Sequence, residues 1–352
     1  MKRCKLLVLA LTGDCNFACR YCYAAEMTRE TMTFATARRA VALAAAGGTP
    51  FVLQFSGGEP LLAFPLLEEI VRYVEAERIP ARMQVQTNGS LFTEERARFL
   101  YRHRVGIGVS IDGRAAVHDR LRRLPNGDGS FAAVMRGMEV LRALRIPVGV
   151  TAVVSKENVR DLPGLAELAY YLGNVRRIGL DLLRGQGRGG ALVPAGEAET
   201  AAAVTTLCRR LDELAALTGI RIALTQTERC GALASGRMEP FEHCFVLRGE
   251  AAFVQADGGI YACSSFFGDE RFLLGDVAHG ISAERECAVA RLIWDGMMRC
   301  HSCDTLAACG GGCFARMHDA GKDNAECGMK RAVVAHAATG IQRSISHAKM
   351  GM

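Results

Sequence analysis

Three cysteines that directly follow an apolar segment constrain this chain more than any other feature. Residues 5–12 read Lys-Leu-Leu-Val-Leu-Ala-Leu-Thr, a short apolar run typical of a buried strand. Cys15, Cys19 and Cys22 come next with the spacing C-x3-C-x2-C. Three thiolates on one short loop can hold an iron–sulfur cluster, but a [4Fe–4S] cubane needs four ligands. The spacing therefore predicts a cluster with one iron open to a substrate or cofactor.

The chain has 14 cysteines in 352 residues. Disulfide frameworks are typical of small secreted chains, whereas clustered cysteines in a long chain indicate metal ligands. The first 12 residues imitate a secretory signal, but no small-residue cleavage site follows, so we expect a reducing cytoplasm. No run of about 18 apolar residues occurs, which predicts no membrane span. The arginines are scattered and aromatic residues make up 7%, so we expect no nucleic-acid partner.

Up to about residue 190 the chain alternates short apolar runs with helical patterns, which predicts βα units and a parallel sheet of an α/β fold. The six expected strands are residues 5–12, 51–56, 82–87, 105–111, 147–154 and 177–183. The main helical patterns between them are residues 34–46, 65–77, 93–103, 131–144 and 162–172. Because a closed barrel needs eight such units, six predict a partial, open (βα)6 barrel.

A glycine-rich stretch at residues 184–190 ends this repeat, and one long helical pattern follows near residues 195–218. Beyond Cys230 the chain becomes dense in cysteine. We therefore predict two domains, a barrel with its linking helix over residues 1–225 and a cysteine-rich domain over residues 226–352.

Several short polar motifs follow the predicted strands. Active sites of βα barrels lie at the carboxyl ends of the strands. After the second strand, Gly57 and Gly58 allow close approach of backbone to a ligand, and Glu59 offers a carboxylate to a cation. Asn88 and Ser110 follow the third and fourth strands, where they can hydrogen-bond a ribose or a carboxylate. Each motif alone is an ordinary turn, but together with the cysteine loop they predict a ligand pocket.

With Tyr21 before its last cysteine, the segment 15–22 resembles the signature of the radical S-adenosylmethionine (SAM) superfamily, whose open iron binds that cofactor. The resemblance implies that the motif at residues 57–59 binds the amino group of the methionyl moiety. Residues 118–131 resemble a further stretch in which Arg122 pairs with the cofactor's carboxylate, a role that suits its planar fork. The neighbouring arginines could equally be solvated surface charges.

The second half of the chain resembles the SPASM domain, an extension of radical SAM enzymes that modify peptides and proteins. The resemblance implies a second auxiliary [4Fe–4S] cluster on Cys300, Cys303, Cys309 and Cys327. It implies a first auxiliary cluster on Cys244, Cys263 and Cys313, with either Cys230 as the preferred fourth ligand or an iron left open for substrate. Zinc is the alternative, since C-x2-C pairs bind it, although the pattern has more cysteines than one zinc ion needs.

The resemblance implies an enzyme that cleaves SAM reductively to a 5′-deoxyadenosyl radical and modifies a ribosomally made peptide. Thioether or carbon–carbon cross-linking is favoured over epimerisation, and a flavodoxin or ferredoxin is the expected reductant. In anaerobic sulfatase-maturating enzymes, which form formylglycine, an aspartate follows the second auxiliary cysteine, whereas here Ser264 follows Cys263. Sulfatase maturation is therefore the alternative. An iron–sulfur electron-transfer protein and a zinc-stabilised binding module are alternatives of other classes, and no catalytic acid or base is identified.

Overall fold

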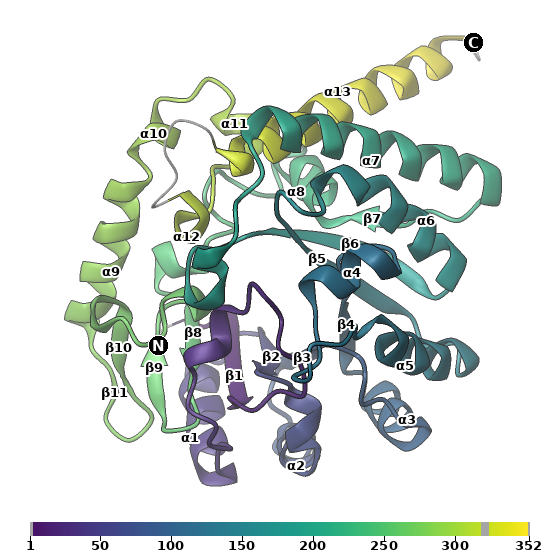
Figure 1. Ribbon diagram of the computed structural model, residues 1–352. Coiled ribbons are helices and arrows are strands. Elements are labelled where there is room, and N and C mark those ends of the chain that lie inside the picture. The colour runs from purple at the N-terminus through teal and green to yellow at the C-terminus, as the bar shows by residue number, and fades with distance from the viewer. Residues whose placement is uncertain (1–2, 318–323, 351–352) are drawn as a thin grey trace.

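The computed structural model describes residues 3–317 and 324–350. Its described strands form one sheet in the order β11-β10-β9-β8-β1-β2-β3-β4-β5-β6-β7. Figure 1 shows strands β1 to β6 as an arc, with the helices of the first half of the chain along its outer side. This arrangement is the α/β partial barrel that the sequence predicts.

The parallel part of the sheet consists of β1 Leu6–Thr12, β2 Phe51–Gly57, β3 Ala81–Thr87, β4 Gly106–Ser110, β5 Val148–Val154 and β6 Val175–Leu182. Each of these strands pairs in parallel with the next. The helices that connect them are α1 Phe34–Ala45, α2 Phe64–Ala76, α3 Glu94–Arg102, α4 Ala115–Leu121, α5 Phe131–Ala143 and α6 Leu162–Leu172. The predicted strands and helices are confirmed to within two residues, and α4 is an addition.

The two faces of each strand differ in polarity. In β3, Met83 and Val85 are buried in the hydrophobic core, whereas Gln84 and Gln86 on the other face are half-buried, and the strand borders a cavity of about 610 Å³. Side chains alternate between the faces of a strand, so this pattern assigns the apolar face to the helices. The inner face of the arc is therefore polar and partly open.

The remaining strands are β7 Ala223–Leu224, β8 Ala251–Val254, β9 Gly259–Tyr261, β10 Leu273–Asp276 and β11 Gly280–Ile281. Strand β8 pairs in parallel with β1, on the opposite side from β2. The sheet of the barrel therefore continues into the C-terminal region, which the sequence did not predict. The domain boundary near residue 225 stays a prediction.

The C-terminal half also contains α7 Glu197–Thr218, α8 Thr225–Ala234, α9 Ala283–Gly296, α10 Met298–His301, α11 Leu306–Cys309, α12 Phe314–Met317 and α13 Ala325–Met350. Short 3-10 helices are η1 Tyr23–Glu26, η2 Pro60–Ala63, η3 Val159–Asp161, η4 Gly187–Ala191, η5 Phe245–Arg248, η6 Ser264–Phe266 and η7 Glu270–Phe272. Helix α13 packs against α7. None of the helices described by the structure is long and apolar enough to span a membrane.

Candidate active site and cysteine clusters

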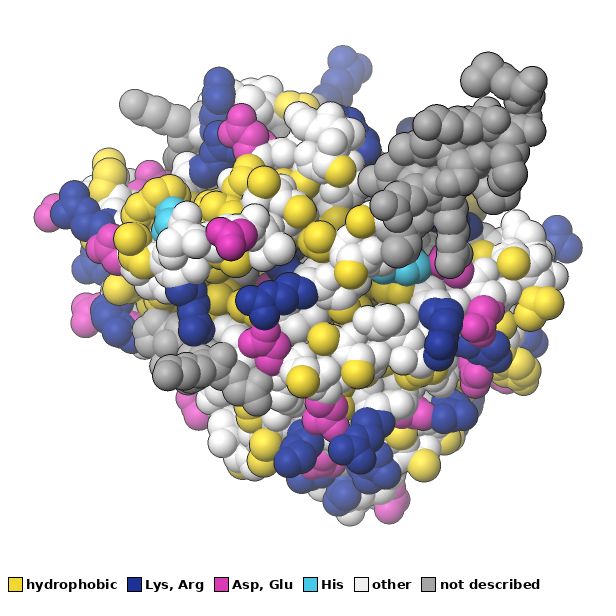
Figure 2. Space-filling view, turned by 90° about the horizontal axis from the view of Figure 1, so that it is seen from above, with side chains coloured by type: hydrophobic (Ala, Val, Ile, Leu, Met, Phe, Trp, Pro, Cys, Tyr) yellow, Lys and Arg dark blue, Asp and Glu magenta, His cyan; other side chains and the backbone are white. Residues whose placement is uncertain are grey.

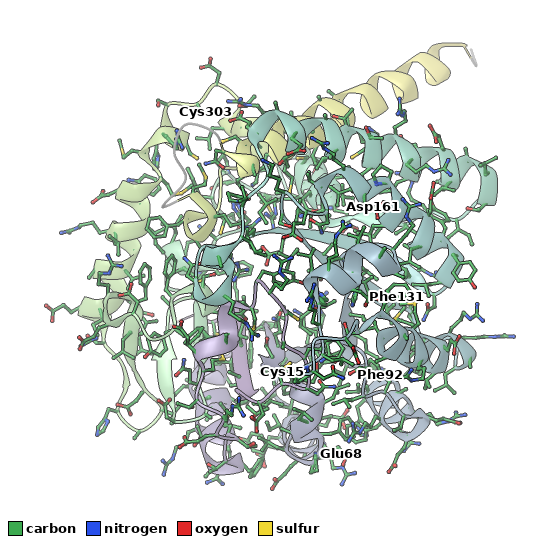
Figure 3. The ribbon with its side chains drawn as sticks, in the orientation of Figure 1. Cys15, Glu68, Phe92, Phe131, Asp161 and Cys303 are labelled. Atoms are coloured by element: carbon green, nitrogen blue, oxygen red, sulfur yellow. The ribbon has the colours of Figure 1, made fainter. Side chains whose placement is uncertain are left out.

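The cysteine loop follows β1 at the carboxyl end of the barrel strands. Cys15, Cys19 and Cys22 line one cavity of about 290 Å³. The loop backbone is held at two points, since Ala18 N donates to the carbonyl of Arg123 at 2.6 Å and Arg20 N to that of Leu121 at 2.8 Å. Figure 3 shows Cys15 on the inner side of the arc, whereas Cys303 lies apart from it near α10 and α11. The structure therefore brings the three predicted cysteines together.

The glycine pair after β2 packs against the backbone of the cysteine loop. A Cβ atom on Gly57, whose φ is +119°, would lie 2.3 Å from the carbonyl oxygen of Thr12, and one on Gly58 would lie 2.2 Å from that of Asp14. Gly58 N donates to the Thr12 carbonyl at 2.8 Å. Both glycines also line the cavity. Their lack of a side chain therefore serves the docking of the loop as well as access to a ligand.

Glu59 lies beneath the cavity and does not line it. Its fully buried carboxylate accepts hydrogen bonds from Thr87 Oγ1 at 2.6 Å, Asn88 N at 2.7 Å and Leu61 N at 3.0 Å. Burial raises the pKa of Glu59, although these three bonds oppose the shift. The carboxylate thus joins the turn after β2 to the turn after β3, whereas the sequence motif suggested that it meets a cation of the ligand.

The other predicted polar residues do line the cavity. Asn88 and Ser110 border it together with Gln86, whose Nε2 donates to Ser110 Oγ at 3.0 Å. Asn88 Nδ2 donates to Asn16 Oδ1 of the cysteine loop at 2.8 Å. The ends of the neighbouring strands β3 and β4 therefore present amide and hydroxyl groups to the space beside the cysteines.

Arg122 also lines the cavity, and a buried carboxylate holds it there. Its Nε donates to Asp112 Oδ2 at 3.0 Å, and its guanidinium carbon lies 5.3 Å from the centre of the Tyr21 ring. The Tyr21 hydroxyl donates to the same Asp112 oxygen, while Val153 N donates to Asp112 Oδ1 at 2.9 Å. Sequence reasoning missed Asp112, although it stands in the Ser-Ile-Asp-Gly stretch that begins at Ser110.

Burial acts on the thiols of the cysteine loop. Burial raises the pKa of Cys15 to about 12 and that of Cys19 to about 11, the latter opposed by Arg122. Bound metal ions replace such thiol protons, because their charge stabilises the thiolates. In the parts of the chain that the structure describes, no three His, Cys, Asp or Glu side chains are arranged to hold a single ion. Three loop thiols that border one cavity fit the cluster that their spacing predicts.

A second group of cysteines lies in the C-terminal region. The cavity that they line has a volume of about 150 Å³, and its cysteines are Cys300, Cys303, Cys309 and Cys327. Lys330 borders the same cavity and donates from Nζ to the Cys309 carbonyl at 3.2 Å. This set matches the four cysteines that the resemblance assigned to the second auxiliary cluster.

A third group consists of Cys244, Cys263 and Cys313. Burial raises the pKa of Cys244 to about 11, and Cys313 and Cys263 act on it electrostatically in the same direction. Cys230 lies elsewhere, on α8, which packs against α11 and α13, and its electrostatic partners include Lys330 and Cys309 rather than this trio. That Cys230 completes the first auxiliary set stays a prediction, and an iron left open on the trio stays the alternative.

Two further polar residues border the barrel cavity at the end of β6. Arg184 donates from Nη2 to Asp181 Oδ2 at 2.7 Å and from Nη1 to Ser265 Oγ at 2.7 Å. Burial favours a higher pKa for Asp181, but Arg184 and Arg316 hold it below its ordinary value. Since Ser265 closely follows Cys263, Arg184 ties the barrel cavity to the third cysteine group. No sequence motif identified this contact.

On the outer surface, charged side chains of both signs lie side by side (Figure 2). Figure 2 views the molecule from above the orientation of Figure 1, and on that face Lys and Arg side chains stand beside Asp and Glu. Among the coloured residues on that face, basic side chains form no continuous stripe. The expectation of no nucleic-acid partner stays a prediction.

Comparison with protein families matches residues 9–169 to the radical SAM superfamily. An uncharacterised protein of Methanocaldococcus jannaschii is 38% identical over 51% of this chain and 63% of its own length. An AdoMet-dependent heme synthase of Methanosarcina barkeri is 35% identical over 49% of the chain and 48% of its length. A cysteine-type anaerobic sulfatase-maturating enzyme of Clostridium novyi is 27% identical over 46% of each. The chain thus spans about half the length of these curated relatives.

Solved structures share the whole fold. Native anSMEcpe with bound AdoMet and Cp18Cys peptide matches with a TM-score of 0.80 at 19% identity, over 98% of this chain and 99% of that one. Streptococcus suis SuiB bound to precursor peptide SuiA matches with a TM-score of 0.62 at 15% identity, over 90% and 73%. Residues 9–169 of this protein are therefore a radical SAM domain, and its cysteine-rich C-terminal region is consistent with a SPASM domain.

Proposed function

We propose that this radical SAM enzyme modifies a ribosomally synthesised peptide, with a thioether or carbon–carbon cross-link as the product. The observation that carries the proposal is the cavity that gathers Cys15, Cys19 and Cys22 with the predicted SAM-binding residues Gly57, Gly58, Asn88, Ser110 and Arg122. Structural neighbours that were solved with bound peptides support a peptide substrate.

In this proposal the three cysteines of the loop hold a [4Fe–4S] cluster and leave one iron to SAM. When bound, cluster and cofactor supply a reductive cleavage whose organic radical abstracts hydrogen from an unactivated carbon. Arg122 would meet the cofactor's carboxylate, because Asp112 occupies only the Nε side of its guanidinium. The backbone of Gly57 and Gly58 would approach its amino group.

The C-terminal cysteines would hold two auxiliary clusters. Cys300, Cys303, Cys309 and Cys327 provide four ligands around one cavity. With Cys230 on α8, the trio of Cys244, Cys263 and Cys313 would leave one iron open. An open iron fits a substrate thiol, which is the group that thioether formation requires.

Sulfatase maturation is the second candidate, and the length of the match to anSMEcpe favours it. The position that carries an aspartate in sulfatase-maturating enzymes is Ser264 here, and Ser264 hydrogen-bonds Tyr23 at the cavity. The next residue, Ser265, accepts a bond from Arg184. Because both positions bear hydroxyls where that chemistry needs a carboxylate base, we favour cross-linking.

The test uses the full chain, loaded with iron and sulfide without oxygen and reduced by dithionite or by a flavodoxin. With SAM and the peptides encoded in neighbouring reading frames, we expect 5′-deoxyadenosine together with a peptide that has lost two hydrogens per cross-link. The variant with Cys15, Cys19 and Cys22 replaced by alanine is the control and should form neither product. An aldehyde that reacts with hydrazine in the peptide would support formylglycine formation instead. Absence of 5′-deoxyadenosine from the iron-loaded wild type would contradict the enzyme and favour an electron carrier.

A further inference from the structure

Among the residues that the structure describes, Arg316 on α12 contacts residues of all three cysteine sites. Its backbone N donates to the carbonyl of Cys313, a member of the trio, at 3.1 Å, and its guanidinium lies within hydrogen-bond reach of the Cys313 sulfur. Its Nη1 donates to Glu326 Oε2 at 2.9 Å, and Glu326 lines the cavity of the four-cysteine group. Its Nε lies 3.5 Å from Asp181 Oδ1, and Asp181 lines the barrel cavity.

The surroundings of Arg316 hold more positive than negative charge. Lys330, whose side chain is 8% exposed, lies 3.9 Å from Glu326, so Glu326 is shared between two cations. Asp181 is likewise shared, because Arg184 bonds its other oxygen. Arg229 adds a third cation, and burial followed by repulsion from Arg316 lowers its pKa. Buried cations in excess are costly unless anionic groups accompany them, and thiolate-bound clusters are such groups.

Two known effects of protein on an iron–sulfur cluster meet at Arg316. The reduction potential of a cluster depends on its net charge and on hydrogen bonds to its sulfurs. A donor and a buried positive charge on a ligand sulfur both stabilise the reduced form, which is the more negative one. Arg316 supplies both to Cys313.

We propose that Arg316 raises the reduction potential of the cluster held by Cys244, Cys263 and Cys313, and that it does so more than it raises the potential of the four-cysteine cluster. The inference rests on the proposed function, since it requires that the auxiliary clusters exist. Arg316 acts through the Cys313 sulfur and is a positioning residue.

The test is a potentiometric titration followed by electron paramagnetic resonance on the full chain. The background variant lacks Cys15, Cys19 and Cys22, so that only auxiliary clusters contribute. R316Q is expected to shift the midpoint potential of the trio's cluster to more negative values, and to shift that of the four-cysteine cluster less. R271Q is the matched control, because Arg271 also lies in the C-terminal half but is largely exposed and pairs with Asp269. It should leave both potentials unchanged.

E326Q is a second test variant, for which we expect a shift of the trio's midpoint potential in the opposite direction. It also tests the inference if R316Q binds too little iron to be measured. Removal of the Glu326 charge leaves Arg316 less neutralised, so the trio's midpoint should become less negative. Equal midpoint potentials of the trio's cluster in iron-loaded wild type and R316Q, or a negative shift in E326Q, would overturn the inference. Neither result would contradict the presence of the auxiliary clusters. An iron count that leaves no auxiliary cluster in the background variant would overturn the proposed function and the inference with it.

Discussion

Replacement of Asp112 by asparagine tests whether one buried carboxylate supports the barrel site. Asp112 is 1% exposed, and it accepts hydrogen bonds from Tyr21, Arg122 and Val153. Asparagine keeps the shape but removes the negative charge. The guanidinium of Arg122, itself 7% exposed, would then be a buried charge without its counter-ion.

The size of the effect follows from burial. Removal of one partner from a buried ion pair costs about 3–5 kcal/mol. The entropy of unfolding is about 2.1 cal/mol/K per residue, which for 352 residues amounts to about 0.7 kcal/mol/K. D112N should therefore lower the melting temperature by about 4–7 °C.

Scanning calorimetry of the oxygen-free, iron-loaded protein measures this shift. D128N is the control, because Asp128 is an exposed carboxylate in a turn and should change stability by less than about 0.5 kcal/mol. The double variant D112N/R122Q should lose less stability than the sum of the two single variants, since it leaves no buried charge unpaired. Additive losses, or a D112N melting temperature equal to that of D128N, would refute the reasoning.

Two further predictions concern backbone packing and ligand identity. G58A places a Cβ 2.2 Å from a backbone oxygen of the cysteine loop, so it should reduce both SAM cleavage and the iron content of the loop's cluster. G185A is the control, because a Cβ there meets no atom within 4 Å, and it should match wild type in both assays. A normal iron count in G58A would contradict the packing argument. C303A should lose the iron of one auxiliary cluster by metal analysis. C230A should keep the wild-type iron content, because Cys230 lies on α8 and its charged neighbours are Lys330, Cys309 and Arg229. Loss of a cluster in C230A would restore Cys230 as a ligand.

The barrel half of the fold was predictable because its signals are local. In β5, Val148, Val150 and Val154 are buried, and the apolar run over residues 147–154 by itself predicts a buried strand there. Strands β8 to β11 have four residues or fewer, and β8 forms by pairing with β1, more than 200 positions away. Such short strands owe their conformation to their partners, and no pattern within them indicates it.

The same distinction explains which site residues were found. The loop cysteines could be predicted because their ligand spacing lies within eight consecutive residues. The strand-end motifs could be predicted because the carboxyl ends of parallel strands lie at the same edge of the sheet. Asp112 and Tyr21 are 91 positions apart, and Arg184 and Ser265 are 81 apart, so each pair exists only in the folded chain. Glu59 shows the converse, since its motif was visible while its bonds to the next turn were not.

The relative placement of the cysteine sites depends on one strand. β1 pairs with β2 through Leu6–Ala10 and with β8 over Leu6–Leu9. The cysteine loop leaves the end of β1, while β8 pairs with β9, which directly precedes Cys263. A shift of one residue in the pairing of β8 with β1 would move each side chain of β8 to the opposite face of the sheet. The distance between the loop cysteines and the trio is therefore set by the register of a continuous sheet, and the long segment between β6 and β8 need not be rigid to maintain it.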